Sequence, residues 1–203
     1  MPLLEIHTNP LRGIWQITED SARMLSLLGR EQFPFPGNTA SEKRRREWLA
    51  VRLLLKEMAG GEASIEYHPN GAPFIPGSDY HISISHTKGY AALLLQKNAS
   101  AGIDIEYRSD RAMKLKERFL SPEEYNALDK TDTLTHSLLY WSAKEVLFKM
   151  MGQENVDFRE HLHIAPFPPE AKGSISASET RTENGAAFQL HYQVTPNYVW
   201  VWS

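Results

Sequence analysis

The segment from Gly102 to Glu106 constrains this chain more than any other, because it alternates apolar and acidic residues. Successive side chains of an extended strand point to opposite faces. Ile103 and Ile105 are therefore expected to face a hydrophobic core, while Asp104 and Glu106 project together from the other face. Neighbouring carboxylates repel each other, and a hard divalent cation such as Mg²⁺, which prefers oxygen ligands, would neutralise them. Lysine or arginine partners are the alternative.

A third acidic candidate, Glu145, lies in a segment with the periodicity of a helix. Between residues 134 and 151, the apolar side chains that recur on one helical face are Leu134, Leu138, Trp141 and Phe148. Glu145 falls on the same face, where a carboxylate is costly unless it is paired or bound to a metal. Lys149 lies one turn further on. A surface salt bridge between Glu145 and Lys149, worth about 0.2–0.5 kcal/mol, is therefore the alternative interpretation.

The composition excludes several classes of protein. The chain has 203 residues, enough for a sizeable core but fewer than two full-sized domains require. Its formal net charge of −3 predicts no general attraction to nucleic acid or to membrane phosphate. The absence of cysteine excludes disulfides and thiolate metal sites. Because the sequence also has no signal-peptide pattern and no apolar run of membrane-spanning length, we expect a cytoplasmic protein. We also expect it to be a monomer.

The order of the expected elements predicts an α+β protein with two similar halves, residues 1–100 and residues 101–203. Each half places one long helix beside a small antiparallel sheet. In the first half we expect a helix over 41–58 and strands over 64–67, 80–85 and 90–96. In the second half we expect a strand from 102, a helix start at 121, a helix over 134–151, and strands near 161–164, 173–177, 188–194 and 198–202.

Five segments form a joint pattern that is more specific than any one of them. In chain order they are Asn70-Gly71-Ala72-Pro73-Phe74, Ile82-Ser83-Ile84-Ser85-His86, Gly102-Ile103-Asp104-Ile105-Glu106, Arg118-Phe119-Leu120-Ser121-Pro122-Glu123-Glu124, and Trp141-Ser142-Ala143-Lys144-Glu145 with Lys149. This pattern resembles the 4'-phosphopantetheinyl transferases of the surfactin-synthetase-activating (Sfp-like) class. The resemblance implies two pseudo-symmetric α+β subdomains, each with a long helix packed on a small antiparallel sheet, and an active site in the cleft between them.

The resemblance also implies a reaction and a set of residues that perform it. The 4'-phosphopantetheine arm of coenzyme A would be transferred to a serine of an apo acyl or peptidyl carrier protein, with release of adenosine 3',5'-bisphosphate. Asp104, Glu106 and Glu145 would bind the Mg²⁺ that holds the diphosphate, and Glu145 is also the best candidate for the base. Lys149 would balance charge on the diphosphate, and Lys144 would help at its periphery.

Other residues are expected to bind coenzyme A away from the reacting phosphate. The resemblance places Ser85 and His86 near its phosphates. From the basic cluster at residues 43–46, Arg46 is the first choice for a phosphate contact and Arg45 the second. The backbone groups expected to frame the adenine are those of Gly71 and Pro73.

The mixed-charge stretch over residues 108–118 is the expected docking surface for the carrier protein. Its proposed contact residues are Arg108, Arg111, Met113, Lys114 and Leu115. Two other functions remain open: a Mg²⁺-dependent phosphodiesterase or nucleotidyl-type hydrolase that uses the same three carboxylates, and a non-catalytic relative that binds coenzyme A or a carrier protein. Ala72 stands where the family commonly has lysine, and this departure mildly favours the non-catalytic alternative. The joint presence of Asp104, Glu106, Glu145 and Lys149 argues against it.

Overall fold

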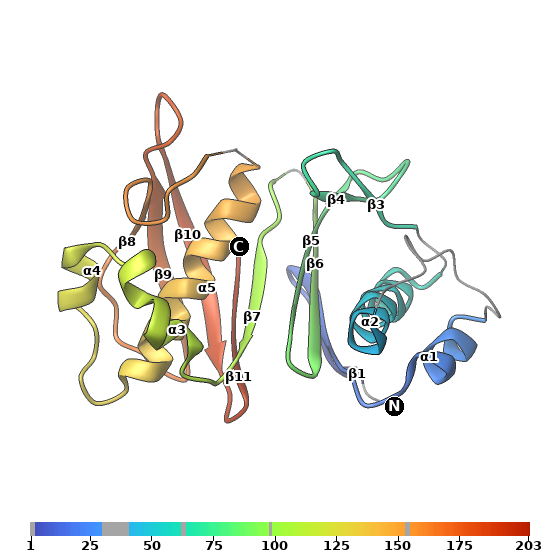
Figure 1. The fold of residues 1–203 in the computed structure, drawn as a ribbon. Coiled ribbons are helices and arrows are strands. Elements are labelled where there is room, and N and C mark those ends of the chain that lie inside the picture. Colours follow the sequence, from blue (N-terminus) through green and yellow to red (C-terminus); the bar gives the residue numbers. More distant parts are fainter. Residues whose placement is uncertain (1–2, 30–40, 62–63, 98, 153–154) are drawn as a thin grey trace. The chain divides into compact units, whose positions relative to one another are not determined.

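The computed structural model describes residues 3–29, 41–61, 64–97, 99–152 and 155–203, with the backbone alone described at residues 111 and 112. The chain divides into two compact units, residues 1–99 and residues 100–203. Each unit combines helices with an antiparallel sheet (Figure 1), which confirms the predicted α+β class. The active-site cleft expected between the halves stays a prediction. None of the described helices is long and apolar enough to cross a membrane.

The first unit is built around a four-stranded antiparallel sheet in the order β1-β2-β6-β5. Its strands are β1 (Leu3–Thr8), β2 (Leu11–Gln16), β5 (Tyr80–Thr87) and β6 (Tyr90–Lys97), and a separate hairpin consists of β3 (Glu66–Tyr67) and β4 (Pro73–Phe74). The helices are α1 (Ser21–Leu27) and α2 (Glu42–Ala59), and α2 packs on one face of the sheet (Figure 1). The strands predicted at 80–85 and 90–96 are confirmed, whereas β1, β2 and α1 were not predicted.

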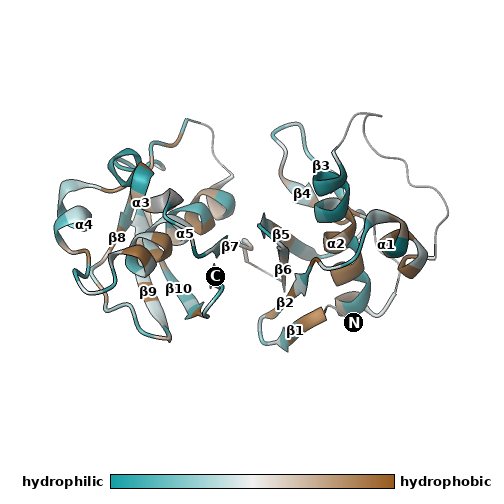
Figure 2. Ribbon diagram, turned by 60° about the horizontal axis from the view of Figure 1, so that its bottom comes forward, coloured by the Kyte–Doolittle hydropathy of each residue, from teal (hydrophilic) through white to brown (hydrophobic). Residues whose placement is uncertain are grey.

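The long helix α2 begins and ends where local signals in the sequence place it. The Ser41 hydroxyl accepts a hydrogen bond of 3.3 Å from the backbone N–H of Arg44 and so caps the first turn. Gly60 ends the helix with a left-handed backbone (φ 68°), a conformation that glycine adopts without strain. Figure 2 shows apolar and hydrophilic stretches alternating along α2, as expected for a helix with one side in the core.

The second unit contains a five-stranded antiparallel sheet in the order β7-β11-β10-β9-β8. Its strands are β7 (Ile103–Tyr107), β8 (Leu162–Ile164), β9 (Lys172–Glu179), β10 (Ala186–Val194) and β11 (Tyr198–Trp202). Its helices are α3 (Arg111–Leu115), the 3-10 helix η1 (Lys116–Arg118), α4 (Pro122–Asn126) and α5 (Thr133–Met151). The long helix and all strands predicted for this half are confirmed, and α5 runs across one face of the sheet (Figure 1).

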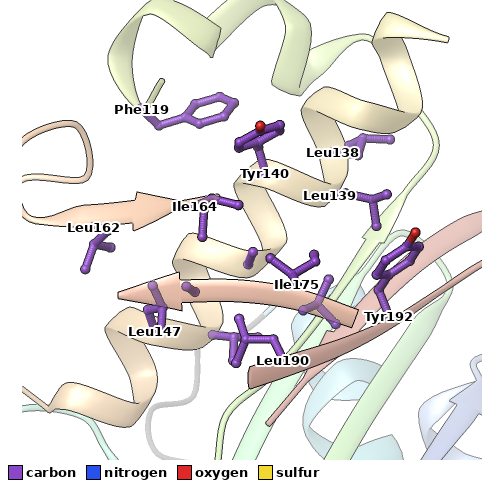
Figure 3. Close-up of a cluster of buried hydrophobic side chains, with 14 of the residues drawn as sticks. Phe119, Leu138, Leu139, Tyr140, Leu147, Leu162, Ile164, Ile175, Leu190 and Tyr192 are labelled. Atoms are coloured by element: carbon purple, nitrogen blue, oxygen red, sulfur yellow. The ribbon is translucent and has the colours of Figure 1, made fainter. Parts of the chain in front are cut away.

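The buried face of α5 is centred differently from the prediction. Leu139, Tyr140 and Leu147 are fully buried and lie in one hydrophobic cluster with Ile175 and Leu190 of the sheet (Figure 3). Of the four residues that defined the predicted face, only Leu138 is fully buried, while Phe148 is 38% exposed. Apolar residues surround most of this helix, so the periodicity alone could not locate the centre of the packed face.

Strand β7 alternates as predicted, but its two faces are not the ones we expected. Asp104 pairs with Val201 and Glu106 with Val199 on the neighbouring strand β11, and paired residues share a face of the sheet. Both valines belong to the hydrophobic cluster that includes α5. The carboxylates therefore lie on the face covered by α5, and Ile103 and Ile105, which are both fully buried, lie on the opposite face.

Gly102, just before β7, allows α5 to approach this strand closely. A Cβ atom added at Gly102 would lie 2.6 Å from the Met150 side chain and 2.8 Å from both a side-chain carbon and the backbone oxygen of Val146. Because one of these contacts is with helix backbone, it cannot be relieved by a rotamer change alone. The glycine thus sets how near the carboxylates of β7 come to the side chains of α5.

We predict that Gly102→Ala destabilises the protein by about 1–3 kcal/mol, the usual range for overpacking a well-filled site. The added methyl group must displace α5 or strain the strand. Gly61→Ala is the matched control, because a Cβ at Gly61 meets no atom within 4 Å. Urea unfolding of both variants measures the difference. Equal unfolding midpoints for Gly102→Ala and wild type would contradict the close approach.

Candidate active site

A polar cluster links β7 to α5 inside the second unit. Asp104 is buried, and its Oδ1 accepts a hydrogen bond of 2.9 Å from the Lys149 ammonium. The same ammonium donates a hydrogen bond of 2.8 Å to the backbone oxygen of Ile103. Two residues further along the strand, Glu106 Oε1 accepts a hydrogen bond of 3.0 Å from the indole N–H of Trp141. Two side chains of α5 thus hold the two carboxylates of the strand.

Glu145 lies in the same helix, between Trp141 and Lys149. Burial raises the pKa of Glu145 to about 7, and the Asp104 carboxylate adds to this rise. Lys149 acts in the opposite direction, and Glu106 contributes a further rise. The structure therefore brings together four predicted site residues, and the crowding of three carboxylates favours the neutral form of one.

The donor atoms of this cluster suit Mg²⁺, although they do not enclose it. Within the described ranges, no three side chains of His, Cys, Asp or Glu are grouped as a metal site groups them. Asp104, Glu106 and Glu145 therefore do not form a preformed three-ligand cage. Mg²⁺ is commonly bound by one or two protein carboxylates and completes its shell with water and substrate phosphates. These three carboxylates form an open set of hard oxygen donors, and a cation would relieve the repulsion between them. The set therefore fits binding of Mg²⁺ together with water and substrate phosphates.

Lys144 does not belong to this cluster, and its predicted role at the diphosphate is wrong. Its side chain is fully buried. The ammonium donates to Glu124 Oε2 at 2.6 Å and to the backbone oxygens of Phe119 and Phe158, both at 2.7 Å. An ammonium has three protons, so these partners satisfy all of them and leave none for a phosphate. Glu124 also accepts from the backbone N–H groups of Ser121 and Ile164, so this buried pair ties α5 to α4 and β8.

A basic cluster in the first unit combines α2 with β5. Arg44 Nη1 and His86 Nε2 are 3.0 Å apart. The carboxylate of Glu47, which is buried, lies 3.7 Å from His86 Nδ1, 3.6 Å from Arg44 Nη1 and 3.7 Å from the Lys43 ammonium. A carboxylate held among three basic groups keeps them together at the start of α2.

The structure changes the ranking of the arginines in this segment. Arg46, the first choice from sequence, is half-buried, and its Nη2 donates a hydrogen bond of 2.9 Å to the backbone oxygen of Ile17. Arg45 is exposed on α2. Arg44, which the sequence ranking passed over, is the one next to His86. Ser85, the neighbour of His86 on β5, is buried.

The hairpin of β3 and β4 presents the predicted adenine-binding backbone. Gly71 occupies its turn with a positive φ of 84°, and its N–H donates to the backbone oxygen of His68 at 2.8 Å. Pro73 pairs with Tyr67 across the hairpin. Whether these backbone groups frame an adenine stays a prediction.

The predicted docking stretch is partly occupied by contacts within the second unit. Arg108 lies 3.8 Å from the Asp132 carboxylate, and Lys114 pairs with Asp110 at 2.7 Å. Leu115 packs against the hydrophobic core, so it is less available as an anchor than we expected. Met113 is half-buried, and the side chain of Arg111 lies outside the described residues.

Sequence reasoning missed one polar side chain in each of the two clusters: Trp141 beside the carboxylates and Glu47 among the basic groups. Trp141 was assigned to packing, although an indole N–H that lies near a carboxylate normally donates to it. Glu47 was overlooked, although its spacing of four residues from Lys43 and three from Arg44 places all three on one face of the helix. That spacing was the available signal, but only the fold brings His86 to the same place.

Comparison with known proteins gives a consistent result. Residues 100–201 match the model of the 4'-phosphopantetheinyl transferase superfamily, and residues 30–96 match that of the 4'-phosphopantetheinyl transferase N-terminal domain. A 4'-phosphopantetheinyl transferase of Bacillus subtilis is 33% identical over 90 residues, which cover 41% of this chain and 38% of that protein. The 4'-phosphopantetheinyl transferase AcpT of Escherichia coli O157:H7 is 30% identical over 115 residues, or 54% and 59% of the two chains.

A third relative, the putative 4'-phosphopantetheinyl transferase slr0495 of Synechocystis sp., is 24% identical over 116 residues, which cover 52% of this chain and 47% of that protein. The chain thus spans between 38% and 59% of the length of these relatives. The matches fall on both units, and the superfamily match includes β7 and α5.

We predict that Glu145→Gln raises the thermal midpoint of the metal-free protein near pH 8.5 and has little effect near pH 4, below the ordinary pKa of the side chain. The folded protein raises the pKa of Glu145 from its ordinary 4.5 to about 7, so wild type loses stability as the pH rises through this window. Gln mimics the protonated form and avoids that loss. Glu57→Gln, on the exposed side of α2, is the control. A surface salt bridge with Lys149 would instead make Glu145→Gln less stable near pH 8.5.

Proposed function

The chain belongs to the 4'-phosphopantetheinyl transferase superfamily, and we propose that it transfers the 4'-phosphopantetheine arm of coenzyme A to a serine of an apo acyl or peptidyl carrier protein. The observation that carries the proposal is the cluster of Asp104, Glu106, Glu145 and Lys149 on β7 and α5. The two family matches fall on consecutive parts of one chain, which supports the surfactin-synthetase-activating class.

The proposed reaction makes specific demands on these residues. The serine oxygen bonds to the β-phosphorus of coenzyme A, the bond from that phosphorus to the bridging oxygen breaks, and adenosine 3',5'-bisphosphate leaves. The serine proton must be accepted, and negative charge on the transferred and leaving groups must be stabilised. Glu145, with a pKa of about 7, is suited to accept a proton near neutral pH. Lys149 supplies a fixed positive charge beside the carboxylates.

Asp104, Glu106 and Glu145 would hold Mg²⁺ in this proposal. When bound, the ion would neutralise charge on the diphosphate and act as a Lewis acid. Lys149 pairs with the buried Asp104 at 2.9 Å and so places a positive charge beside this proposed ligand. The absence of an enclosed cage among the described residues leaves room for substrate oxygens around the ion.

The basic cluster of the first unit is proposed to bind the coenzyme A phosphates that do not react. Arg44 and His86 present two nitrogen groups side by side, with Ser85 next along the strand and Arg45 exposed on the same helix turn. Glu47 would orient Arg44 and His86 before the phosphate arrives. Arg46 supports this cluster indirectly through its bond to the backbone of residue 17.

The carrier protein is proposed to dock on residues 108–118, which follow β7 directly. Lys114 is exposed on α3, and Arg108 is half-buried at the end of the strand. Basic groups beside the carboxylate cluster would favour an acidic partner and speed its approach. The carrier could belong to fatty-acid, polyketide, nonribosomal-peptide or lysine biosynthesis.

The direct test is incubation with coenzyme A, Mg²⁺ and candidate apo-carriers, followed by intact mass of the carrier. We predict a gain of one phosphopantetheine arm, loss of transfer in excess chelator, and partial recovery with Mn²⁺, which accepts a similar oxygen shell. Glu145→Gln should reduce turnover by about 10²–10⁴-fold, or roughly 3–5 kcal/mol in the transition state.

Other outcomes of this assay identify the alternatives. Release of adenosine bisphosphate without any carrier would indicate a phosphodiesterase. Binding of coenzyme A without transfer to any carrier would indicate a non-catalytic relative. Undiminished transfer in excess chelator would remove Mg²⁺ from the proposal.

A second experiment separates coenzyme A affinity from chemistry. Arg44→Ala and His86→Ala should raise KM for coenzyme A roughly 10–100-fold with little change in kcat, since they remove charge-assisted contacts to phosphates that do not react. Arg23→Ala, on the exposed side of α1, is the matched control and should change neither constant. Losses confined to kcat would place Arg44 and His86 at the reacting phosphate instead.

A further inference from the structure

We propose that Trp141 is a positioning residue that holds the carboxylate of Glu106 in place for metal binding. The inference deepens the proposed function and rests on it. It starts from the hydrogen bond of 3.0 Å between the indole N–H of Trp141 and Glu106 Oε1. This bond joins α5 to β7 and involves a side chain of the proposed metal site.

The indole of Trp141 is itself held in a fixed orientation. Its ring packs edge-on against Phe119, with centroids 5.2 Å apart, and lies 5.7 Å from the ring of Phe158. Phe119 is almost fully buried. Because the ring packs against Phe119 and Phe158, it cannot rotate freely, and its N–H points in one direction. The donor is therefore preorganised.

Glu106 needs such a partner more than Asp104 does. A glutamate has one more rotatable bond than an aspartate, and Glu106 is only half-buried, near the end of an edge strand. Repulsion from Asp104 on the same face of β7 would turn its carboxylate away. A hydrogen bond to one oxygen restricts the side chain and directs the other oxygen. Such partners of metal ligands typically contribute 10–100-fold to metal affinity or activity.

The two carboxylates of β7 are held by donors of different charge. Asp104 is held by the ammonium of Lys149, which brings a full positive charge. Glu106 is held by a neutral indole N–H. A neutral donor orients the carboxylate without itself cancelling the charge. The pairing thus supplies orientation at one ligand and charge balance at the other.

The alternative is that Trp141 only fills space beside the core, where its ring packs. Trp141→Phe separates the two roles, because phenylalanine keeps an aromatic ring between Phe119 and Phe158 but has no N–H. Tyr140→Phe is the matched control in the same helix. It removes a buried hydroxyl that has no hydrogen-bond partner among the described residues.

The experiment measures Mn²⁺ binding to the whole chain by electron paramagnetic resonance, without coenzyme A or carrier, and the thermal midpoint with and without Mn²⁺. We expect Trp141→Phe to weaken Mn²⁺ binding about 10–100-fold and to reduce the Mn²⁺-induced rise in midpoint. Tyr140→Phe should bind Mn²⁺ as wild type does. Unchanged Mn²⁺ affinity in Trp141→Phe would overturn the positioning role.

A double-mutant cycle tests whether Trp141 acts through Glu106. On a Glu106→Ala background, Trp141→Phe should cause no further loss of Mn²⁺ affinity, because the group that it positions is gone. Additive losses would mean that Trp141 acts by packing alone.

The transfer assay of the wild type tests the proposed function independently of this inference. Normal transfer with unchanged Mn²⁺ affinity in Trp141→Phe overturns only this inference, whereas a wild type that binds no Mn²⁺ overturns the metal assignment and the positioning role together.

Discussion

The close packing of α5 on β7 is the constraint on which the rest of the second unit depends. It is possible because residue 102 has no side chain. Without that approach, Lys149 could not donate to both the Ile103 carbonyl and Asp104, and the indole of Trp141 could not reach Glu106. The same approach places Glu145 near two other carboxylates, which together with burial raises its pKa to about 7.

The orientation of α5 also depends on the buried ion pair between Lys144 and Glu124. Breaking a buried pair by removing one partner is costly, because it leaves an uncompensated charge. Lys144 meets Glu124 and two backbone carbonyls there, and Glu124 completes the cap of α4. Adjacent residues thus have opposite roles: Lys144 anchors the helix, and Glu145 faces the polar cluster.

Much of the fold could be predicted from local signals. The helix over 41–58 and the alternation of β7 were both predicted, because the Ser41 cap, the Gly60 stop and the period of a strand depend only on neighbours in the sequence. The first 29 residues carried weaker signals, so the hairpin of β1 and β2 and the helix α1 were missed. In α5, apolar residues on nearly all sides hid which face is buried, because periodicity cannot choose between equally apolar stripes.

The sequence by itself determined the candidate site residues: the acidic pair on a strand, the Glu145 and Lys149 pair on a helix, and His86 with a basic segment. Only the tertiary structure decided the partners: Lys149 with Asp104, Trp141 with Glu106, Arg44 rather than Arg46 with His86, and Lys144 in the interior. Spacing along the chain defines the faces of single strands and helices. Which donor meets which acceptor depends on how those elements pack. These pairs are 20 to 45 positions apart in the chain, so they meet only after the elements have packed.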